Sequence, residues 1–583
     1  MSKESNIENI RHSLSHLLAA AILKKYPDTK LGIGPTIETG FYYDFLFAKP
    51  INEEDLAEFE KEIKSLINKN LDFKSEEITS AAAKKLLKDQ PFKLELIAEL
   101  SKEKSPISIY RTGDVFTDLC RGPHVKNTKE INPDAFKLTH IAGAYWKGNE
   151  KNPMLTRIYG LAFNTKKELD EYILMMEEAK KRDHRELGKK FELFTFSEEI
   201  GQGLPIWLPN GTIIKDEIEN LAKEKESAEG YQRVSTPIIT KEDLFIKSGH
   251  LPHYKESMYA PMDIDGENYY LKPMNCPFHH TIYSSKPRSY RELPLRLAEY
   301  GLCHRYEKSG ELQGLMRVRS LSMNDAHIYV RPDQVRDEIK KVIELHEYYY
   351  KLFGIKKAKY RLSLHDKKEL GKKYFDMPEA WKENEQILRE VLQDLKVDFY
   401  EAENEAAFYG PKIDIQIYSI IGKEYTLGTV QLDFAQPQRF NLKYIDENGK
   451  EVMPYVIHRA PLSTHERFIG FLIEHYAGAF PTWLSPVQAI ILPISEKVNN
   501  YAKEISDSLI SSGVRVKIDD SNETLGKKIR GAEMKKIPYI LVVGEKEAQA
   551  GTIAVRRYGK GDLGAQNIKK FTEEITAEIK NRV

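Results

Sequence analysis

Residues Leu295–Val330 read LRLAEYGLCHRYEKSGELQGLMRVRSLSMNDAHIYV, and this stretch decides the fold of the centre of the chain. Two apolar segments flank a region rich in Gly, Ser and charged residues, which predicts an antiparallel β-hairpin. Arg305 and Glu307 are two residues apart, as are Arg317 and Arg319, so on extended strands each pair shares a face. The expected hairpin therefore presents several guanidinium groups and one carboxylate on a common surface.

The chemistry of this surface favours a polyphosphate ligand. Arg stays charged, and its planar fork matches the oxygens of phosphate groups. The alternative is a solvated hairpin, because isolated surface charges usually contribute little to stability or binding. Asp325 and His327 share a face of the return strand and extend the polar surface beyond what a solvated hairpin needs.

Length and composition limit the classes of protein to consider. A chain of 583 residues and 67.3 kDa predicts several domains, because single cores stop growing near ~250–300 residues. Lys and Arg total 88 and Asp and Glu total 88, so a site for nucleic acid has to be local. Three cysteines do not predict a disulfide framework. Because the sequence has no apolar run of membrane-spanning length and no signal or transit peptide, we expect a cytoplasmic protein without a membrane partner.

Several short motifs resemble those of one enzyme family. HRYE, with Arg317 and Asp325 after it, looks like motif 2 of the class II aminoacyl-tRNA synthetases; GYQRVSTPII (230–239) looks like motif 1 and HERFIGFL (465–472) like motif 3. With KPMNCP, AFYGPKID and GTVQLDF, the chain resembles the threonyl-tRNA synthetases in particular. The sequence contains neither a P-loop nor the signature pair of the Rossmann-type synthetases.

The resemblance implies a multidomain α+β fold. It consists of a class II catalytic core built on an antiparallel sheet, an N-terminal α/β editing domain of the bacterial type and a C-terminal α/β anticodon-binding domain. The family's N-terminal ubiquitin-like module is expected to be absent, and motif 1 implies a homodimer. Alternating strand and helix patterns near the C-terminus predict a mostly parallel sheet there. A capping box of Thr165 and Glu168 predicts a linker helix. The expected boundaries are 1–164 for the editing domain, 165–190 for the linker helix, 191–484 for the catalytic domain and 485–583 for the anticodon-binding domain.

A group of histidines and a cysteine lies in the N-terminal third. His12 and His16 are adjacent on the surface of an expected amphipathic helix (6–26), and DVFTDLCRGPHV supplies Asp118, Cys120 and His124. The residue types alone allow a tetrahedral zinc site, or surface histidines beside a buried cysteine. The resemblance implies a third interpretation, an editing site that positions water and the ester bond of serine wrongly attached to tRNA. The aromatic and basic segment 142–160 would then stack on and clamp the RNA end.

For ATP, the resemblance assigns roles to five residues of the catalytic core. Arg305 is expected to grip the α-phosphate, where charge develops during activation, and Glu307 to accept a hydrogen bond from the adenine amino group. Arg317 and Arg467 are expected to hold the γ-phosphate, with Mg²⁺ neutralising the remaining charge. Gln431 matches a position near the adenylate.

Three further residues are implied in handling threonine. Asp325 is expected to take its ammonium group, and Tyr409 to contact it. His250 matches a histidine proposed to assist transfer to the tRNA ribose, and the alternative is an ordinary loop histidine. The implied catalytic residues are thus His250 and the two arginines Arg305 and Arg467.

A metal site is implied by Cys276, His327 and His458. By residue type alone, a single Cys and two separate His are more often core residues. Each of them lies in a family motif, however, and one thiolate with two imidazoles forms a zinc set with one open coordination position, so one Zn²⁺ per subunit is expected. Zinc that binds both the amino and the hydroxyl group of threonine rejects valine. Serine lacks only a methyl group, and the ~1–3 kcal/mol of binding energy that this group contributes is too little to exclude serine. A second, hydrolytic site that removes serine is therefore predicted.

The C-terminal hundred residues resemble the class IIa anticodon-binding domain. Asn522, Glu547 and Arg556 match its base-reading positions, while Lys536 stands where Arg is common and lacks the guanidinium fork. As isolated residues, all of them fit an ordinary polar surface equally well.

Two positions in motif 2 depart from the family pattern. Leu321 replaces an aromatic residue that stacks on adenine, a loss of roughly 0.5–1.5 kcal/mol of contact. Met323 stands where many relatives have a polar residue. Neither change removes a catalytic charge.

The function predicted from the sequence is an ATP-dependent ligase that joins L-threonine to tRNA(Thr) and edits seryl-tRNA(Thr). The non-enzymatic alternative is a catalytically weak, synthetase-like RNA-binding or editing protein. A metal hydrolase centred on the N-terminal cluster is a further alternative, but it leaves the arginine-rich hairpin unexplained.

Overall fold

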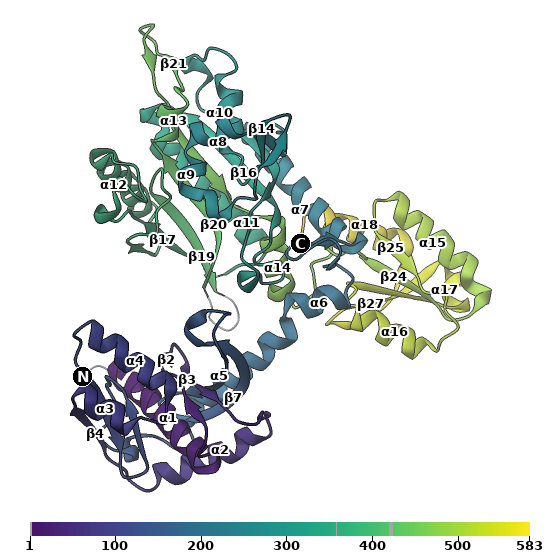
Figure 1. Ribbon diagram of the computed structural model, residues 1–583. Coiled ribbons are helices and arrows are strands. Elements are labelled where there is room, and N and C mark those ends of the chain that lie inside the picture. Colours follow the sequence, from purple (N-terminus) through teal and green to yellow (C-terminus); the bar gives the residue numbers. More distant parts are fainter. Residues whose placement is uncertain (1–2, 357, 419–423) are drawn as a thin grey trace. The chain divides into compact units, whose positions relative to one another are not determined.

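The computed structural model describes residues 3–356, 358–418 and 424–583, and the chain divides after Glu177 into two compact units (Figure 1). Each unit has its own hydrophobic core. Among the described helices, none combines the length and the apolar character that crossing a bilayer requires.

The N-terminal unit is built around helix α1 (Lys3–Lys25), which packs on a five-stranded antiparallel sheet. The predicted apolar face of α1 is confirmed, since Leu14, Leu17, Leu18 and Ile22 are fully buried. The sheet has the order β1-β3-β8-β7, with β2 beside β3, and a second sheet has the order β4-β5-β6. The other elements of this unit are β1 (Lys30–Leu31), β2 (Thr36–Ile37), β3 (Gly40–Leu46), α2 (Asp55–Ile67), β4 (Phe73–Glu77), α3 (Ser80–Leu86), α4 (Pro91–Lys102), β5 (Ser108–Thr112), β6 (Phe116–Leu119), β7 (Phe136–Tyr145) and β8 (Met154–Ala162).

The predicted linker helix consists of two helices, α5 (Lys166–Arg182) and α6 (His184–Lys190). Thr165 and Glu168 form the predicted reciprocal hydrogen bonds at the start of α5. The interruption falls at Asp183, whose carboxylate accepts a hydrogen bond from the backbone N–H of Arg185 at 2.8 Å. Asp183 therefore ends one helix and caps the next.

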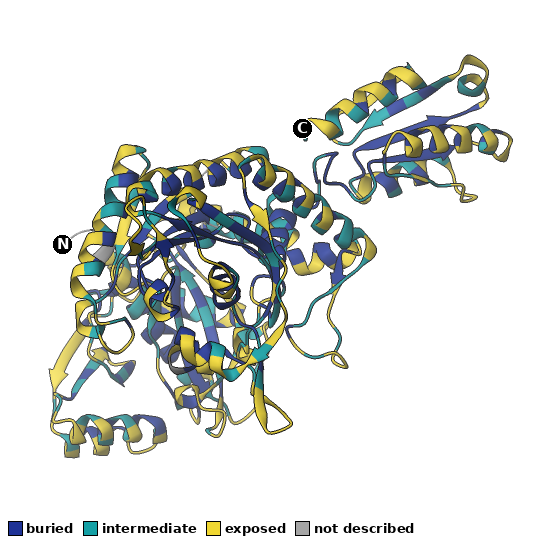
Figure 2. Cartoon of the chain, turned by 90° about the horizontal axis from the view of Figure 1, so that it is seen from above, coloured by how far each residue is buried: buried dark blue, intermediate teal, exposed yellow. Residues whose placement is uncertain are grey.

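An eight-stranded sheet forms the centre of the second unit, in the order β11-β15-β16-β23-β20-β19-β17-β18. Its inner pairs are antiparallel, as predicted, and only the two edge pairs, β11 with β15 and β17 with β18, are parallel. Figure 2 shows the inner strands as largely buried and the helices around them with exposed outer faces. The strands are β11 (Gln232–Arg233), β15 (Leu295–His304), β16 (Ser320–Val330), β17 (Ala358–Ser363), β18 (Phe399–Ala402), β19 (Lys412–Tyr418), β20 (Glu424–Asp433) and β23 (Tyr455–Ala460).

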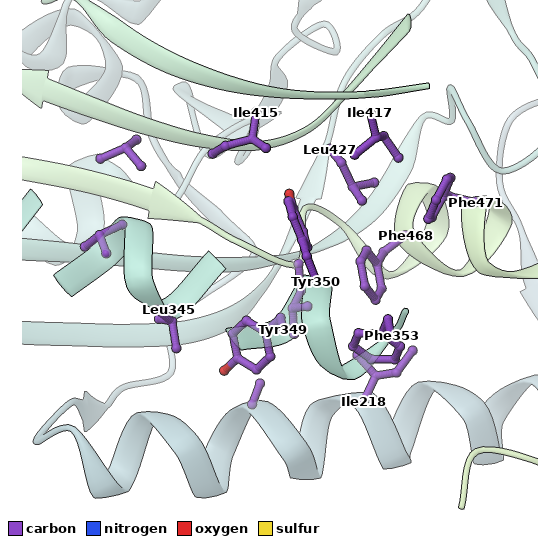
Figure 3. Packing of buried hydrophobic residues seen from close by; sticks show 14 of the residues in the cluster. Ile218, Leu345, Tyr349, Tyr350, Phe353, Ile415, Ile417, Leu427, Phe468 and Phe471 are labelled. Atoms are coloured by element: carbon purple, nitrogen blue, oxygen red, sulfur yellow. The ribbon is translucent and has the colours of Figure 1, made fainter. Parts of the chain in front are cut away.

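Helices α7 (Pro209–Ala228), α11 (Val335–Leu352) and α14 (His465–His475) supply the core against this sheet. Figure 3 shows Phe353, just after α11, beside Ile218 of α7 and Phe468 of α14. The rings of Phe353 and Phe468 meet edge to face with centroids 5.0 Å apart, a preferred aromatic geometry. This packing fixes α14 relative to the sheet.

The smaller elements of this region surround the sheet. They are β9 (Phe194–Thr195), β10 (Ile206–Trp207), β12 (Ile239–Lys241), α8 (Glu242–Ser248), α9 (His250–Tyr254), β13 (Met262–Ile264), β14 (Glu267–Leu271), α10 (Cys276–Ser284), α12 (Pro378–Asp394), α13 (Gln436–Arg439), β21 (Tyr444–Ile445) and β22 (Glu451–Val452).

The hairpin predicted from Leu295–Val330 is confirmed, but the positions of its charges are not. β15 ends at His304 and β16 begins at Ser320, so Arg305, Glu307, Arg317 and Arg319 lie in the connecting loop. One further backbone hydrogen bond joins the Arg305 N–H to the Arg319 carbonyl at 2.9 Å, and beyond it the chain folds back within the loop, where Gln313 pairs with Arg317. The loop, rather than a strand face, therefore carries the charged groups.

The C-terminal part has a five-stranded sheet in the order β25-β24-β26-β27-β28. The prediction of a mostly parallel sheet was wrong for half of it, because β26, β27 and β28 pair antiparallel. α17 has only six residues, too few for the crossover that a parallel neighbour requires. The elements are β24 (Ala489–Pro493), α15 (Asn499–Ser511), β25 (Val516–Ile518), α16 (Leu525–Met534), β26 (Tyr539–Val543), α17 (Glu545–Ala550), β27 (Thr552–Arg557), β28 (Gly561–Asn567) and α18 (Ile568–Lys580).

Candidate active site

A cavity of about 490 Å³ opens between the β15–β16 loop, the central strands and the start of α14. It collects nearly all the residues predicted for the catalytic core, although they come from segments far apart in the sequence. The predicted residues that line it are Cys276, Arg305, Glu307, Arg317, Asp325, Tyr409, Gln431, His458 and Arg467.

One end of the cavity is strongly cationic. Arg467 donates a hydrogen bond to the carbonyl of Met316 at 3.3 Å, and in the described structure neither Arg467 nor Arg305 forms an ion pair. Burial, and then repulsion from Arg305 and Arg317, lower the pKa of Arg467. Arg305 and Arg467 are partly buried, and a guanidinium group removed from water without a carboxylate partner is costly, so this end of the cavity is suited to an anion.

Arg317 is the exception, because it is already paired. Its Nε donates to Glu307 at 2.7 Å, and its terminal nitrogen lies 2.8 Å from Glu311. The sequence assigned Glu307 and Arg317 to opposite ends of one ligand, whereas the structure joins them in an ion pair. A ligand that engages both has to replace this contact.

The strand register places three predicted residues in a row. On neighbouring strands, His327 lies directly opposite His458, and His458 lies directly opposite Gln431. Directly opposite residues point to the same face of a sheet, with Cβ atoms about 4.5–5.5 Å apart. The fold therefore explains how residues more than a hundred positions apart form one site.

Cys276, His327 and His458 form the predicted metal-ligand set in the described structure. Their ligand atoms all lie within 4.8 Å of one another, and all three residues are buried. His327 Nε2 is buried without a hydrogen-bond partner among the described residues. His458 Nε2 lies 2.9 Å from the Asp433 carboxylate, the usual second contact of a metal-bound histidine. The donor set therefore fits Zn²⁺.

Two residues that the sequence did not single out, His279 and Glu299, lie on the Nδ1 side of the His327 ring. His279 Nδ1 lies 2.8 Å from His327 Nδ1, and Glu299 lies 3.3 Å from His279 Nε2. Glu299 also accepts hydrogen bonds from the backbone and the hydroxyl group of Thr236, which lies in motif 1. This chain of contacts fixes the orientation of the His327 ring.

The remaining predicted substrate residues surround this set. Tyr409 stacks on His458 with centroids 5.0 Å apart and donates a hydrogen bond to Gln431. Asn275 donates to Asp325 at 3.1 Å. His250 does not line the cavity in the described structure, because Met274 stands between them, with its sulfur 3.1 Å from His250 Nε2. Burial lowers the pKa of His250 to about 3.

Leu321 takes the place of the expected aromatic residue without leaving a gap. It lines the cavity and packs with Cys303 and Val318 in a small buried cluster, against which Met323 also packs. The departure from the family pattern thus provides an aliphatic rather than an aromatic wall.

A second cavity, of about 440 Å³, lies in the N-terminal unit and is lined by His12, His16, Asp118 and Cys120 of the predicted editing cluster, while His124 lies beside it in contact with Cys120. Cys120 Sγ lies 3.3 Å from both His12 Nε2 and His124 Nε2, and the imidazole of His16 lies 4.0 Å from the Asp118 carboxylate. Burial lowers the pKa of all three histidines and raises that of Cys120 to about 11, so the group is neutral near pH 7. The ligand atoms of His12, His16, Cys120 and His124 lie within 4.8 Å of one another, a geometry that suits a metal ion as well as a water molecule.

The sequence analysis missed two members of this cavity region. Lys93 of α4 forms a buried ion pair with Asp118 at 2.7 Å, and the hydroxyl group of Tyr43 donates to the same carboxylate. A lysine between Phe92 and Leu94 on an amphipathic helix was the available signal. Asp118 is thus held by a lysine and a tyrosine rather than by histidines alone.

Part of the RNA contact predicted for 142–160 was wrong. Trp146 is buried, packs against Phe92 and donates a hydrogen bond to Glu95, so its ring is not free to stack on a base. Lys147 is paired with Glu95 and Glu99. Tyr145 remains 44% exposed and is the aromatic residue of this segment that can stack.

The predicted anticodon residues are not in contact with one another. Asn522 is exposed after β25, and Glu547 accepts a hydrogen bond from the backbone of Gly544 beyond the carboxyl end of β26. Arg556 lies opposite Ile540, near the amino end of β26, and contacts Asp562 at 3.4 Å. A single ligand could contact both Glu547 and Arg556 only if it extended along the length of β26.

Similarity to curated proteins covers nearly the whole chain. A threonine–tRNA ligase from Geobacillus kaustophilus is 49% identical over 579 residues, 99% of this chain and 88% of that protein. The chain belongs to the threonine–tRNA ligase family. A second threonine–tRNA ligase, from Listeria monocytogenes, is 49% identical over 98% of this chain and 89% of its own length.

Domain models and a solved structure agree with this family. Residues 259–476 match the class II tRNA synthetase core domain, 488–578 an anticodon-binding domain and 107–159 the second additional domain of threonyl- and alanyl-tRNA synthetases. The RNA-binding domain of threonyl-tRNA synthetase from Cryptosporidium parvum is 36% identical with a TM-score of 0.65 and covers 68% of this chain and 98% of that one.

These findings confirm the family, the fold class and the ligase function predicted from the sequence. They do not favour the alternative of a synthetase-like RNA-binding or editing protein.

Proposed function

We propose that the large cavity activates threonine with ATP and transfers it to tRNA(Thr). The observation that carries this proposal is that Arg305 and Arg467, which have no ion-pair partner in the described structure, line the same cavity as Cys276 and His458 of the Cys/His₂ set. The arginines suit the phosphates of ATP, and the Cys/His₂ set suits a metal that selects an amino acid with a hydroxyl group.

In this proposal Arg305 contacts the α-phosphate, whose charge grows as the carboxylate of threonine attacks. Arg467 takes the γ-phosphate together with Arg317, which leaves its ion pair with Glu307. Glu307 is then free to accept a hydrogen bond from adenine, so one ion pair is exchanged for two ligand contacts. Class II synthetases use Mg²⁺ with ATP, and Mg²⁺ would neutralise the remaining phosphate charge.

Cys276, His327 and His458 would hold one Zn²⁺ per subunit. When bound, zinc supplies a Lewis acid that takes the amino and hydroxyl groups of threonine. The contacts of Thr236, Glu299 and His279 support this proposal, because they keep His327 Nε2 directed at the site. Asp325 and Tyr409 would contact the amino acid from either side, and Gln431 the adenylate.

His250 would act only at the transfer step. Met274 lies between it and the cavity, so a role in transfer requires Met274 to move when tRNA binds. The test is a His250→Ala variant, which should slow transfer to tRNA and leave amino acid activation unchanged.

For the N-terminal cavity we propose hydrolysis of seryl-tRNA(Thr) by His12, His16, Asp118, Cys120 and His124. The match to the second additional domain and the gathering of His12, His16, Asp118 and Cys120 around one cavity support this role. Asn522, Glu547 and Arg556 are proposed to read the anticodon. The domain boundaries at 164, 190 and 484 are part of the same proposal.

A homodimer is proposed from motif 1 and from exposed apolar residues within it and on the sheet that follows it. Ile238, Ile239, Met262 and Ile264 are 38–43% exposed and belong to, or directly precede, the three-stranded sheet β12-β14-β13. Clustered exposed apolar side chains mark protein interfaces. Light scattering should therefore give a mass twice that of the chain. We also propose that the protein acts in the cytoplasm.

The test is threonine-dependent ATP–pyrophosphate exchange by the full chain, with and without a zinc chelator. Exchange with threonine, weaker exchange with serine and none with valine are expected, and chelation should abolish all of it. If folded, zinc-loaded protein shows no exchange, the proposal is wrong.

A further inference from the structure

His184 begins α6, is only 3% exposed and lies outside every sequence motif of the family resemblance. Its Nδ1 lies 2.7 Å from the carboxylate of Glu474 on α14. Its Nε2 lies 3.0 Å from the backbone nitrogen of Leu315 in the β15–β16 loop. Because a backbone N–H can only donate, Nε2 is the acceptor and Nδ1 carries the proton given to Glu474. The neighbours thus fix one tautomer of the ring.

Leu315 directly precedes the two residues of the loop that form part of the cationic end of the cavity. The next residue, Met316, offers its carbonyl to Arg467 at 3.3 Å, and Arg317 follows directly. Leu315 and Met316 line the ATP cavity, whereas His184 does not touch it in the described structure. The histidine therefore holds the loop from the side away from the ligand.

The His184 ring is also packed tightly against the backbone of the β15–β16 loop. A Cβ atom on Gly314 would lie 2.3 Å from His184 Nε2, and one on Gly470 of α14 would lie 3.2 Å from Leu315 Cβ. The loop, the ring and α14 are therefore packed as closely as their backbones allow, and a displaced ring would shift Met316.

We propose that His184 is a positioning residue for ATP, which sets the separation of Arg317 and Arg467 by tying the β15–β16 loop to α14. This inference rests on the proposed function, because it takes the cavity to be the ATP site. It assigns the linker helix α6 a part in nucleotide binding that none of the three class II motifs contains.

Two substitutions separate the two hydrogen bonds of the ring. Gln places its amide oxygen near the position of Nε2, so His184→Gln keeps an acceptor for Leu315. Asn places its amide nitrogen near the position of Nδ1, so His184→Asn keeps the donor to Glu474 and leaves the Leu315 N–H unpaired. His475→Asn, one residue beyond Glu474, is the matched control, because the His475 ring packs on Phe471 and Tyr476 rather than on the loop.

The experiment is steady-state ATP–pyrophosphate exchange with the full chain, together with hydrogen exchange of peptides from residues 312–319. For His184→Asn we expect the KM for ATP to rise about tenfold or more, the KM for threonine to stay within twofold, and the 312–319 amides to exchange faster. His475→Asn should stay within about threefold of wild type. His184→Gln keeps the acceptor for Leu315 and the backbone N–H contact of residue 184 with Glu474 at 3.5 Å, so its KM for ATP should lie between those of wild type and His184→Asn.

Each other outcome overturns the inference in a recognisable way. A wild-type KM for ATP in His184→Asn excludes the positioning role. Equal losses for ATP and threonine in both His184 variants, with a lower melting temperature, indicate a purely structural residue. If the wild-type protein shows no ATP–pyrophosphate exchange at all, both the proposed function and this inference are wrong. If exchange is normal in the wild type and impaired only in a His184 variant, the proposed function stands.

Discussion

The buried ion pair between Lys93 and Asp118 provides a sharp test of the electrostatics in the N-terminal unit. The two charges are 2.7 Å apart, and their side chains are only 2% and 3% exposed. We predict that Lys93→Met destabilises this unit by about 3–4 kcal/mol, because removing one partner leaves a buried charge without compensation. Protonating an ordinary aspartic acid at pH 7 costs about 4 kcal/mol, which sets the upper limit of the loss.

The double variant distinguishes charge from packing. In Lys93→Met with Asp118→Asn no charge remains buried, and the amide oxygen introduced at position 118 can still accept one of the two hydrogen bonds that the carboxylate receives, from the Tyr43 hydroxyl group or from the backbone N–H of Leu119. We therefore expect it to lose only about 1–2 kcal/mol, less than Lys93→Met alone. Lys147→Met is the control, since Lys147 pairs with Glu95 of the same helix as Lys93 at 2.6 Å but is about one-third exposed and should lose at most about 1 kcal/mol.

The assay is urea-dependent hydrogen exchange of peptides from α4 and β6, which reports the local free energy of unfolding. Free energies of the two single variants, Lys93→Met and Asp118→Asn, that add up to that of the double variant within about 0.5 kcal/mol would refute the reasoning. So would a Lys147→Met loss as large as that of Lys93→Met, because burial would then have no influence.

Three further outcomes are expected. Arg467→Gln should lower ATP–pyrophosphate exchange about 10²-fold without lowering the melting temperature, because this partly buried arginine has no ion-pair partner in the described structure to lose; a fall in both would indicate a structural role. Burial raises the pKa of Glu466 to about 7, above the value of a free glutamate, so its carboxylate destabilises the fold at high pH and this penalty fades as the pH falls toward 4.5. Glu466→Gln should therefore gain about 3 kcal/mol at pH 8 and little at pH 5 in urea unfolding, and an equal gain at both values would contradict the assignment. Cys276→Ser should lose zinc measured by elemental analysis, whereas Cys303→Ser, whose thiol contacts Asn275 instead, should retain it; equal retention would exclude Cys276 as a ligand.

The sequence predicted the members of the catalytic cavity well, because short motifs carry them. The alternating pattern of Leu295–Val330 also predicted the correct hairpin. It did not show that β15 ends at His304, since side-chain alternation continues through HRYE while the backbone pairing with the return strand ends after Arg305. The placement of Arg305 and Arg317 in a loop follows from hydrogen bonds that no local pattern records.

Residues that act through distant contacts were the ones missed. His184 meets a loop 131 positions away, and Lys93 meets a carboxylate on another element. For Trp146 the error was the reverse, since a role was predicted that the fold does not allow. An aromatic residue in a basic segment suggested an RNA contact, but the ring packs in a hydrophobic core. Each of these depends on which segments become neighbours, and helix or strand periodicity does not contain that information.

The tight packing at Gly314 has a consequence for how this enzyme can change over time. With φ at +50° and no space for a Cβ atom beside the His184 ring, position 314 accepts only glycine while the histidine is present. A replacement at 314 requires a smaller side chain in place of the ring, and that change gives up the hydrogen bond to Leu315. Even then the new Cβ atom would lie 2.8 Å from Arg185 Cγ at a positive φ, so position 314 can change only after several of its neighbours have changed.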